Sequence, residues 1–105
     1  MQRSRDGRGS SAGVLAELEA VLVSRRDAPA PAGSYSVALV TDPVKAQRKI
    51  MEEAFELCLE LGRPAPDPVR TAEEAADVLF SVLAGLVGAG VGLDTVLAEL
   101  AERRR

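Results

Sequence analysis

Two groups of acidic residues lie in the middle of the chain and are its strongest candidates for chemistry. Residues 52–56 read EEAFE, and residues 74–77 read EAAD. Side chains three residues apart lie on one face of a helix. Each group therefore supplies one pair of neighbouring carboxylates: Glu53 with Glu56, and Glu74 with Asp77. Two such pairs facing each other would form an all-oxygen cage, which suits Mg²⁺ or Mn²⁺.

The same acids also have a simpler interpretation as solvated or capping residues. Glutamate near the start of a helix interacts favourably with the helix dipole, and Thr71 with Glu74 matches a capping box. Aspartate, however, is a poor helix former, and Asp77 stands directly before the most apolar segment of the chain. Four carboxylates packed together repel one another unless a cation or protons neutralise them. The pattern as a whole therefore predicts a divalent metal site.

A metal site made only of carboxylates typically handles phosphates, because the metal bridges phosphoryl oxygens and orients the attacking water. Glu52, beside the cage, could bind a second metal or serve as general base. Lys49, one turn before Glu53, could contact a phosphate oxygen or simply form a salt bridge to Glu53. The chain has no histidine, which excludes His-based zinc sites and Ser-His triads. It also has no Gly-rich phosphate loop, which excludes a P-loop enzyme.

The elements that must position these acids are predicted to be helices. Apolar residues make up 47% of the 105 residues, which is typical of a folded chain. Asp42-Pro43 and Asp67-Pro68 each place an N-cap residue before a proline and so predict two helix starts. Amphipathic spacing adds helices over residues 14–25 and 93–103, with a short helix or turn over 34–40. The sequence therefore predicts an all-α antiparallel bundle of four to five helices.

The segment that follows Asp77 is apolar nearly all round as far as Val87. A helix without a polar face is buried on all sides. In so short a chain this implies burial against a second subunit, so we expect a homodimer that completes the bundle.

The remaining features concern the termini and the surroundings of the protein. Residues 1–12 are polar and rich in Ser and Gly, so we expect a disordered tail before a domain over residues 13–105. The net charge of −3, without a continuous basic stripe, argues against nucleic-acid binding. No segment predicts a secretory signal or a membrane span, so we expect a cytoplasmic protein.

The acidic motif resembles that of the all-α nucleotide pyrophosphohydrolases, the MazG-like superfamily. Within it, more of the chain is similar to the phosphoribosyl-ATP pyrophosphohydrolase family of histidine biosynthesis. The matching segments are VLVSRR at 21–26, SYS at 34–36, KIMEEAFE at 49–56, EAADVLF at 74–80 and GVGLD at 90–94.

The resemblance implies Mg²⁺-dependent hydrolysis of phosphoribosyl-ATP to phosphoribosyl-AMP and pyrophosphate, the second step of histidine synthesis. It implies that the metal ligands are Glu53, Glu56, Glu74 and Asp77, with Glu52 as a second-metal ligand or base. The residues facing the substrate would be Arg25, Ser34, Tyr35 and Lys49. The first three also have structural interpretations: a charge at a helix C-terminus, a cap and a packing aromatic.

Two positions depart from the pattern of the resembled family. The family usually has Tyr-His after its second acidic motif, where this chain has Phe80-Ser81, and it has Gly where this chain has Met51. Ser81 is one turn past Asp77, so we expect it to face the site. The departures leave a MazG-like hydrolase of canonical or damaged nucleoside triphosphates as an alternative. A non-enzymatic helical dimerisation module with solvated acids is a third interpretation.

Overall fold

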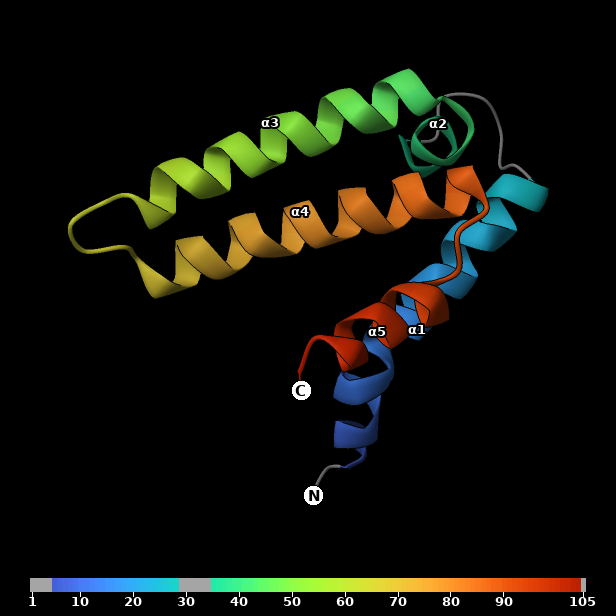
Figure 1. The fold of residues 1–105 in the computed structure, drawn as a ribbon, viewed down its shortest axis with the longest axis horizontal. Helices are drawn as coiled ribbons and strands as arrows, with labels where there is room; N and C mark the ends of the chain where they lie inside the picture. The colour runs from blue at the N-terminus through green and yellow to red at the C-terminus, as the bar shows by residue number, and fades with distance from the viewer. Residues whose placement is uncertain (1–4, 29–34, 105) are drawn as a thin grey trace.

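The structure, a computed structural model, describes residues 5–28 and 35–104, with side chains from Gly13 onward. These residues form five helices and no strand: α1 (Arg5–Asp27), α2 (Tyr35–Thr41), α3 (Pro43–Leu61), α4 (Pro68–Ala89) and α5 (Leu93–Glu102). Helices α3 and α4 form a long antiparallel hairpin, α2 lies across its open end, and α1 and α5 extend away from it (Figure 1). The prediction of an all-α bundle of four to five helices is confirmed.

The ends of the hairpin helices follow from local sequence. The carboxylates of Asp42 and Asp67 each accept hydrogen bonds from the backbone N–H groups of the second and third residues of the helix that follows, at 3.0 to 3.4 Å. Both predicted helix starts are therefore confirmed. Thr71, the rival N-cap, instead donates its hydroxyl to the carbonyl of Asp67 at 2.7 Å. Helix α4 ends at Gly90, whose φ of 76° favours glycine.

The core lies at the open end of the hairpin, where α4 meets α1, α2 and the start of α5. Its buried apolar residues are Leu22, Leu39, Val40, Leu83, Ala84, Val87 and Leu93. Helix α4 passes very close to α2 at this point, because a Cβ atom on Gly88 would lie 2.8 Å from the carbonyl oxygen of Val40. The glycine therefore sets how closely the two helices pack.

Two polar contacts attach α1 to the C-terminal half of the chain. Nη1 of Arg26 donates to the carbonyl of Val87 near the end of α4, at 2.9 Å. Oε2 of Glu19 accepts the backbone N–H of Leu93, the first residue of α5, at 2.8 Å. The N-cap of α5 is Gly92, which has no side chain to satisfy that N–H. Glu19 of α1 therefore supplies the hydrogen-bond acceptor that the N-cap residue of α5 lacks.

The N-terminal helix differs from the expectation. It begins at Arg5 rather than at residue 14, so it extends into the segment expected to be a disordered tail. Residues 5–12 contain no proline, the residue that opposes a helix most strongly, although Gly7 and Gly9 lower their helix propensity. The short helix expected over residues 34–40 is found as α2, whereas Ser34 lies outside the described residues.

Within the described part of the chain, no single helix is long and apolar enough to cross a membrane, and only the pair α4 and α5, bent by 116°, passes such a test together. The cytoplasmic location stays a prediction.

Substituting Gly88→Ala should destabilise the protein, because the added methyl group would collide with the backbone of Val40 rather than with a flexible side chain. We expect a loss of about 1 to 3 kcal/mol in the free energy of unfolding, measured by urea denaturation. Gly92→Ala is the control, since no atom lies within 4 Å of a Cβ there. Equal stability of the two variants would show that α2 and α4 are not in tight contact.

Candidate metal centre

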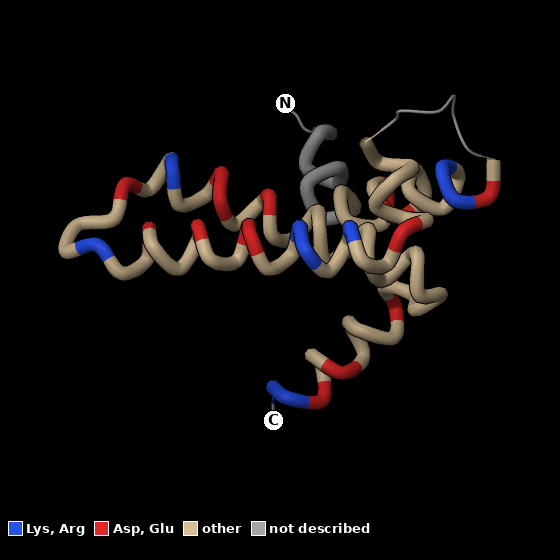
Figure 2. The backbone as a smooth tube through the Cα atoms, turned by 90° about the horizontal axis from the view of Figure 1, so that it is seen from above, with Lys and Arg blue, Asp and Glu red and all other residues tan. Residues whose placement is uncertain are grey.

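The α3–α4 hairpin brings three of the four predicted metal ligands together. Glu53, Glu56 and Glu74 each offer a carboxylate oxygen, and these oxygens lie within 4.8 Å of one another. Figure 2 shows the acidic positions of the two helices gathered along the middle of the hairpin. Oxygens that share one Mg²⁺ ion lie about 3 to 4 Å apart, given bonds of about 2.1 Å. Small side-chain movements would therefore bring the three groups to bonding distance of one cation.

Glu74 is the most constrained of these carboxylates. Its residue is only 8% exposed. Its Oε1 atom is buried and accepts no hydrogen bond from the described residues. Its Oε2 atom lies 3.5 Å from Nη2 of Arg70. Burial raises the pKa of Glu74, and the negative charge of Glu56 raises it further, while Arg70 opposes the shift. A buried carboxylate with an unsatisfied oxygen is what a bound cation would stabilise.

Asp77 lies at the edge of this group rather than within it. Its side chain is exposed, and it is not among the three residues whose oxygens lie within 4.8 Å of one another. Its charge nevertheless contributes to the raised pKa of Glu74. The expected cage of four carboxylates is thus a cluster of three, because the aspartate side chain is one methylene shorter and lies toward solvent.

Lys49 connects the carboxylates to the predicted substrate residue Tyr35. Its Nζ atom lies 3.3 Å from Oε2 of Glu53 and 5.6 Å from the centroid of the Tyr35 ring. Hydrogen bonding to Tyr35 and to Glu53 raises the pKa of Lys49, so the ammonium stays charged. The i,i+4 salt bridge expected as one interpretation is present, and it holds the ammonium group beside the carboxylate cluster.

A cavity of about 240 Å³ adjoins this contact. Its lining residues are Tyr35, Ala38, Leu39, Lys45, Arg48, Lys49 and Glu52. Glu52 is exposed and lines this cavity. It is not part of the cluster of carboxylate oxygens, which belong to Glu53, Glu56 and Glu74. Arg25 is exposed near the end of α1 and is not among the lining residues. Of the four predicted substrate residues, Tyr35 and Lys49 therefore lie together at this cavity, whereas Arg25 does not line it. Ser34 lies outside the described residues.

Glu60 is a buried acid whose role the sequence did not reveal. It is 4% exposed, and its Oε2 accepts the backbone N–H of Asp67 at 3.0 Å. Its Oε1 lies 3.7 Å from Nε of Arg70, which also reaches Glu74. Glu60 thus closes the loop end of the hairpin. A second cavity, of about 330 Å³, lies there, lined by Glu56, Leu59, Glu60, Arg63, Arg70 and Glu74.

Ser81, expected to face the site, is closed off from solvent. It lies seven residues after Glu74, on the same face of α4, but only 2% of it is exposed. It lines neither of the two cavities beside the carboxylates. One turn further along α4, a Cβ on Gly85 would lie 3.3 Å from Cδ1 of Ile50, which shows how tightly this face packs on α3. Ser81 is thus buried on the face of α4 that carries Glu74, and its expected place facing the site stays a prediction.

Substituting Glu74→Gln should stabilise the metal-free protein at neutral pH. Because its folded pKa is raised, Glu74 contributes stability that is complete below the ordinary glutamate pKa and is lost as pH rises through the folded pKa. We expect the substitution to remove this part of the pH dependence, measured by denaturation across a pH series in a chelator.

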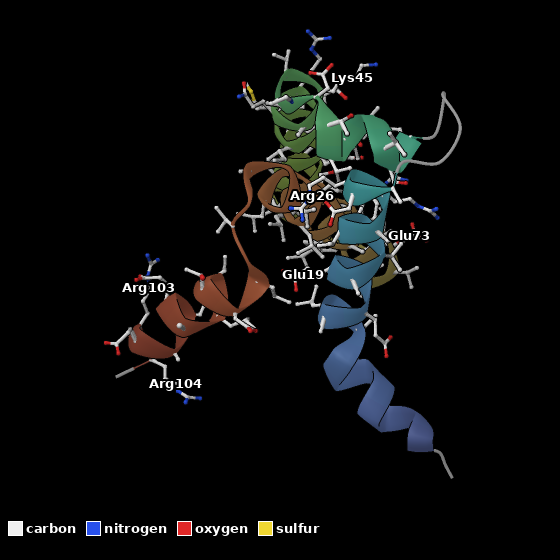
Figure 3. The ribbon with its side chains drawn as sticks, turned by 90° about the vertical axis from the view of Figure 1, so that its right-hand side faces the viewer. Glu19, Arg26, Lys45, Glu73, Arg103 and Arg104 are labelled. Atoms are coloured by element: carbon white, nitrogen blue, oxygen red, sulfur yellow. The ribbon has the colours of Figure 1, made fainter. Side chains whose placement is uncertain are left out.

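The matched control is Glu73→Gln at the neighbouring exposed residue, which Figure 3 labels. It removes the same charge outside the cluster. It should change neither the stability at neutral pH nor the dependence of stability on pH. If Glu74→Gln were no more stable than Glu73→Gln at pH 7, burial of the Glu74 charge would not be costly.

Comparison with known proteins identifies the family that the chain resembles. Residues 15–104 match the family described as phosphoribosyl-ATP pyrophosphohydrolase. The chain is 44% identical over 95 residues to the phosphoribosyl-ATP pyrophosphatase of Methanosphaerula palustris, covering 88% of this chain and 93% of that one. It is 42% identical over 91 residues to the phosphoribosyl-ATP pyrophosphatase of Methylobacterium radiotolerans, covering 86% and 81%.

A larger relative contains the same region as one part of its length. The histidine biosynthesis trifunctional protein of Neurospora crassa is 44% identical over 79 residues, which are 75% of this chain but 8% of that protein. No solved structure matches the chain. The extent of the family match and the identity to relatives of similar length agree, and the chain belongs to the phosphoribosyl-ATP pyrophosphohydrolase family of hydrolases.

Proposed function

We propose that this chain hydrolyses phosphoribosyl-ATP to phosphoribosyl-AMP and pyrophosphate in histidine biosynthesis, with Mg²⁺ bound by the acids of α3 and α4. The observation that carries the metal site is the buried Oε1 of Glu74, which accepts no hydrogen bond from the described residues and belongs to a cluster with Glu53 and Glu56. An oxygen-only donor set suits Mg²⁺, and Mn²⁺ would fit the same ligands. The substrate follows from family membership.

Each residue of the site has a role in this proposal. When bound, the metal would polarise phosphoryl oxygens of the triphosphate and lower the pKa of a water molecule. Glu53, Glu56 and Glu74 hold it, and Asp77 adds negative charge at its edge. Lys49 carries a positive charge beside Glu53 and so can contact a phosphate oxygen. Glu52, in the adjoining cavity, serves as general base or second-metal ligand.

We also propose that the chain acts as a homodimer through the hairpin. Met51, Phe55 and Leu59 are spaced four residues apart on α3 and are 72%, 63% and 59% exposed. Leu79 on α4, expected to be buried on all sides, is 56% exposed in the single chain. Apolar rows of this length on a surface mark interaction sites. A second copy would cover them and supply the burial that the apolar sequence of α4 predicts.

Purified protein should release pyrophosphate from phosphoribosyl-ATP only when Mg²⁺ is added. Glu53→Gln and Glu56→Gln should each lower kcat/KM by at least about 100-fold, because each removes a metal ligand. Mg²⁺ should also raise Tm of the native protein, and less so in these variants. Turnover of ordinary nucleoside triphosphates without turnover of phosphoribosyl-ATP would instead favour the MazG-like alternative. No activity and no Mg²⁺-dependent change in Tm would favour the dimerisation module.

The double substitution Met51→Ser with Phe55→Ser should convert the dimer to a monomer, because it removes two large apolar side chains from the exposed row on α3. Sedimentation velocity at micromolar protein concentration measures the change. Leu100→Ser is the control, since this residue is similarly exposed at 55% but lies on α5. A wild-type protein that sediments as a monomer would rule out the proposed interface.

A further inference from the structure

Helix α3 carries three basic residues beside the proposed metal centre. The proposed mechanism gives a role to only one of them, Lys49. Lys45, Arg48 and Lys49 have the spacing of one helix face, and all three line the 240 Å³ cavity with Tyr35. Lys49 is paired with Glu53. The side chains of Lys45 and Arg48 form no ion pair with any of the described residues. Glu52 is the one acid that lines the cavity, so the lining carries a net positive charge.

The basic residues at the loop end of the hairpin differ from this group. Arg63 and Arg70 lie between 3.5 and 3.9 Å from carboxylate oxygens of Glu60 and Glu74, so their charges are already compensated. Figure 2 shows basic positions on both sides of the acidic middle of the hairpin. The uncompensated ones lie on the side of α2. The second cavity holds three acids and two arginines, so it is a poorer site for an anion.

The position of Lys45 and Arg48 along the helix separates them from the triphosphate. With a rise of about 1.5 Å per residue, Lys45 lies about 12 Å along the axis from Glu53 and Arg48 about 7.5 Å. A triphosphate held at the carboxylate cluster is therefore not the natural partner of Lys45. The cavity at Lys45 and Arg48 therefore offers a place for a second anionic group of the substrate. The aromatic ring of Tyr35 lines the same cavity and offers a flat apolar surface next to it.

We propose that Lys45 and Arg48 bind the phosphate monoester of the phosphoribosyl group, while the triphosphate of the same molecule is held at the carboxylate cluster. This assignment rests on the proposed function, because that substrate carries a phosphate monoester on one ribose and a triphosphate on the other. The guanidinium of Arg48 can donate two parallel hydrogen bonds to a phosphate, and Lys45 adds a point charge. The pair is thus a specificity determinant, because a nucleoside triphosphate lacks the phosphate monoester that Lys45 and Arg48 would bind.

The test compares substrates with and without the monoester in the double variant Lys45→Ala with Arg48→Ala. We expect KM for phosphoribosyl-ATP to rise about 10- to 100-fold with little change in kcat, because charge-assisted hydrogen bonds are lost. Hydrolysis of the same compound lacking the monoester should be equally slow in the wild type and the variant. An equal loss on both compounds would overturn the proposal, because the pair would then act on the triphosphate, and so would no loss on phosphoribosyl-ATP.

The matched control is Arg103→Ala with Arg104→Ala, which removes the same charge from the two residues that follow α5, distant from Lys45 (Figure 3). It should leave both substrates unaffected. Binding of ribose 5-phosphate, followed by NMR titration, tests the subsite even if phosphoribosyl-ATP is not hydrolysed. Binding by the wild type and the control but not by the Lys45 and Arg48 variant supports the subsite. Absent binding, or equal binding by all three proteins, overturns it, whereas failure of the proposed function shows only as absent pyrophosphate release by the wild type.

Discussion

The close contact of α3 with α4 is the constraint on which the rest of the molecule depends. At the α2 end the contact is made by small residues: Ala46 is buried on α3, and a Cβ atom on Gly85 of α4 would lie 3.3 Å from Cδ1 of Ile50 on α3. Close packing at this end restricts the position and the crossing angle of the two helices. The hairpin therefore carries its acidic half to a fixed separation. The carboxylates are close together because the apolar half requires it.

The acidic half of the hairpin is stabilised by basic side chains rather than by apolar burial. Arg70 bridges Glu60 and Glu74, and Lys49 neutralises Glu53. These side chains satisfy part of the charge but leave Oε1 of Glu74 without a donor among the described residues. Removing a charged group from water is costly unless it is paired. The hairpin thus keeps one buried carboxylate oxygen without a hydrogen-bond donor among the described residues, at the cluster where the proposed metal would bind.

Much of the fold could be predicted because its signals are local. An Asp-Pro step fixes a helix start within four residues, and it did so at Asp42 and Asp67. Spacing along one helix also predicted that Glu53 and Glu56 share a face. What could not be predicted depends on contacts between distant segments. The structural role of Glu60 requires the loop before α4 to return to α3, and the burial of Ser81 depends on how α4 is rotated against its neighbour.

The link between Glu19 and Leu93 joins residues 74 positions apart. Helix α5 is short, its own N-cap is a glycine, and among the described residues the acceptor for its first N–H is the side chain of Glu19 in α1. Ribosomes make α1 before α5. The acceptor is therefore already present when α5 is synthesised, and this hydrogen bond can form only after the four other described helices have been made.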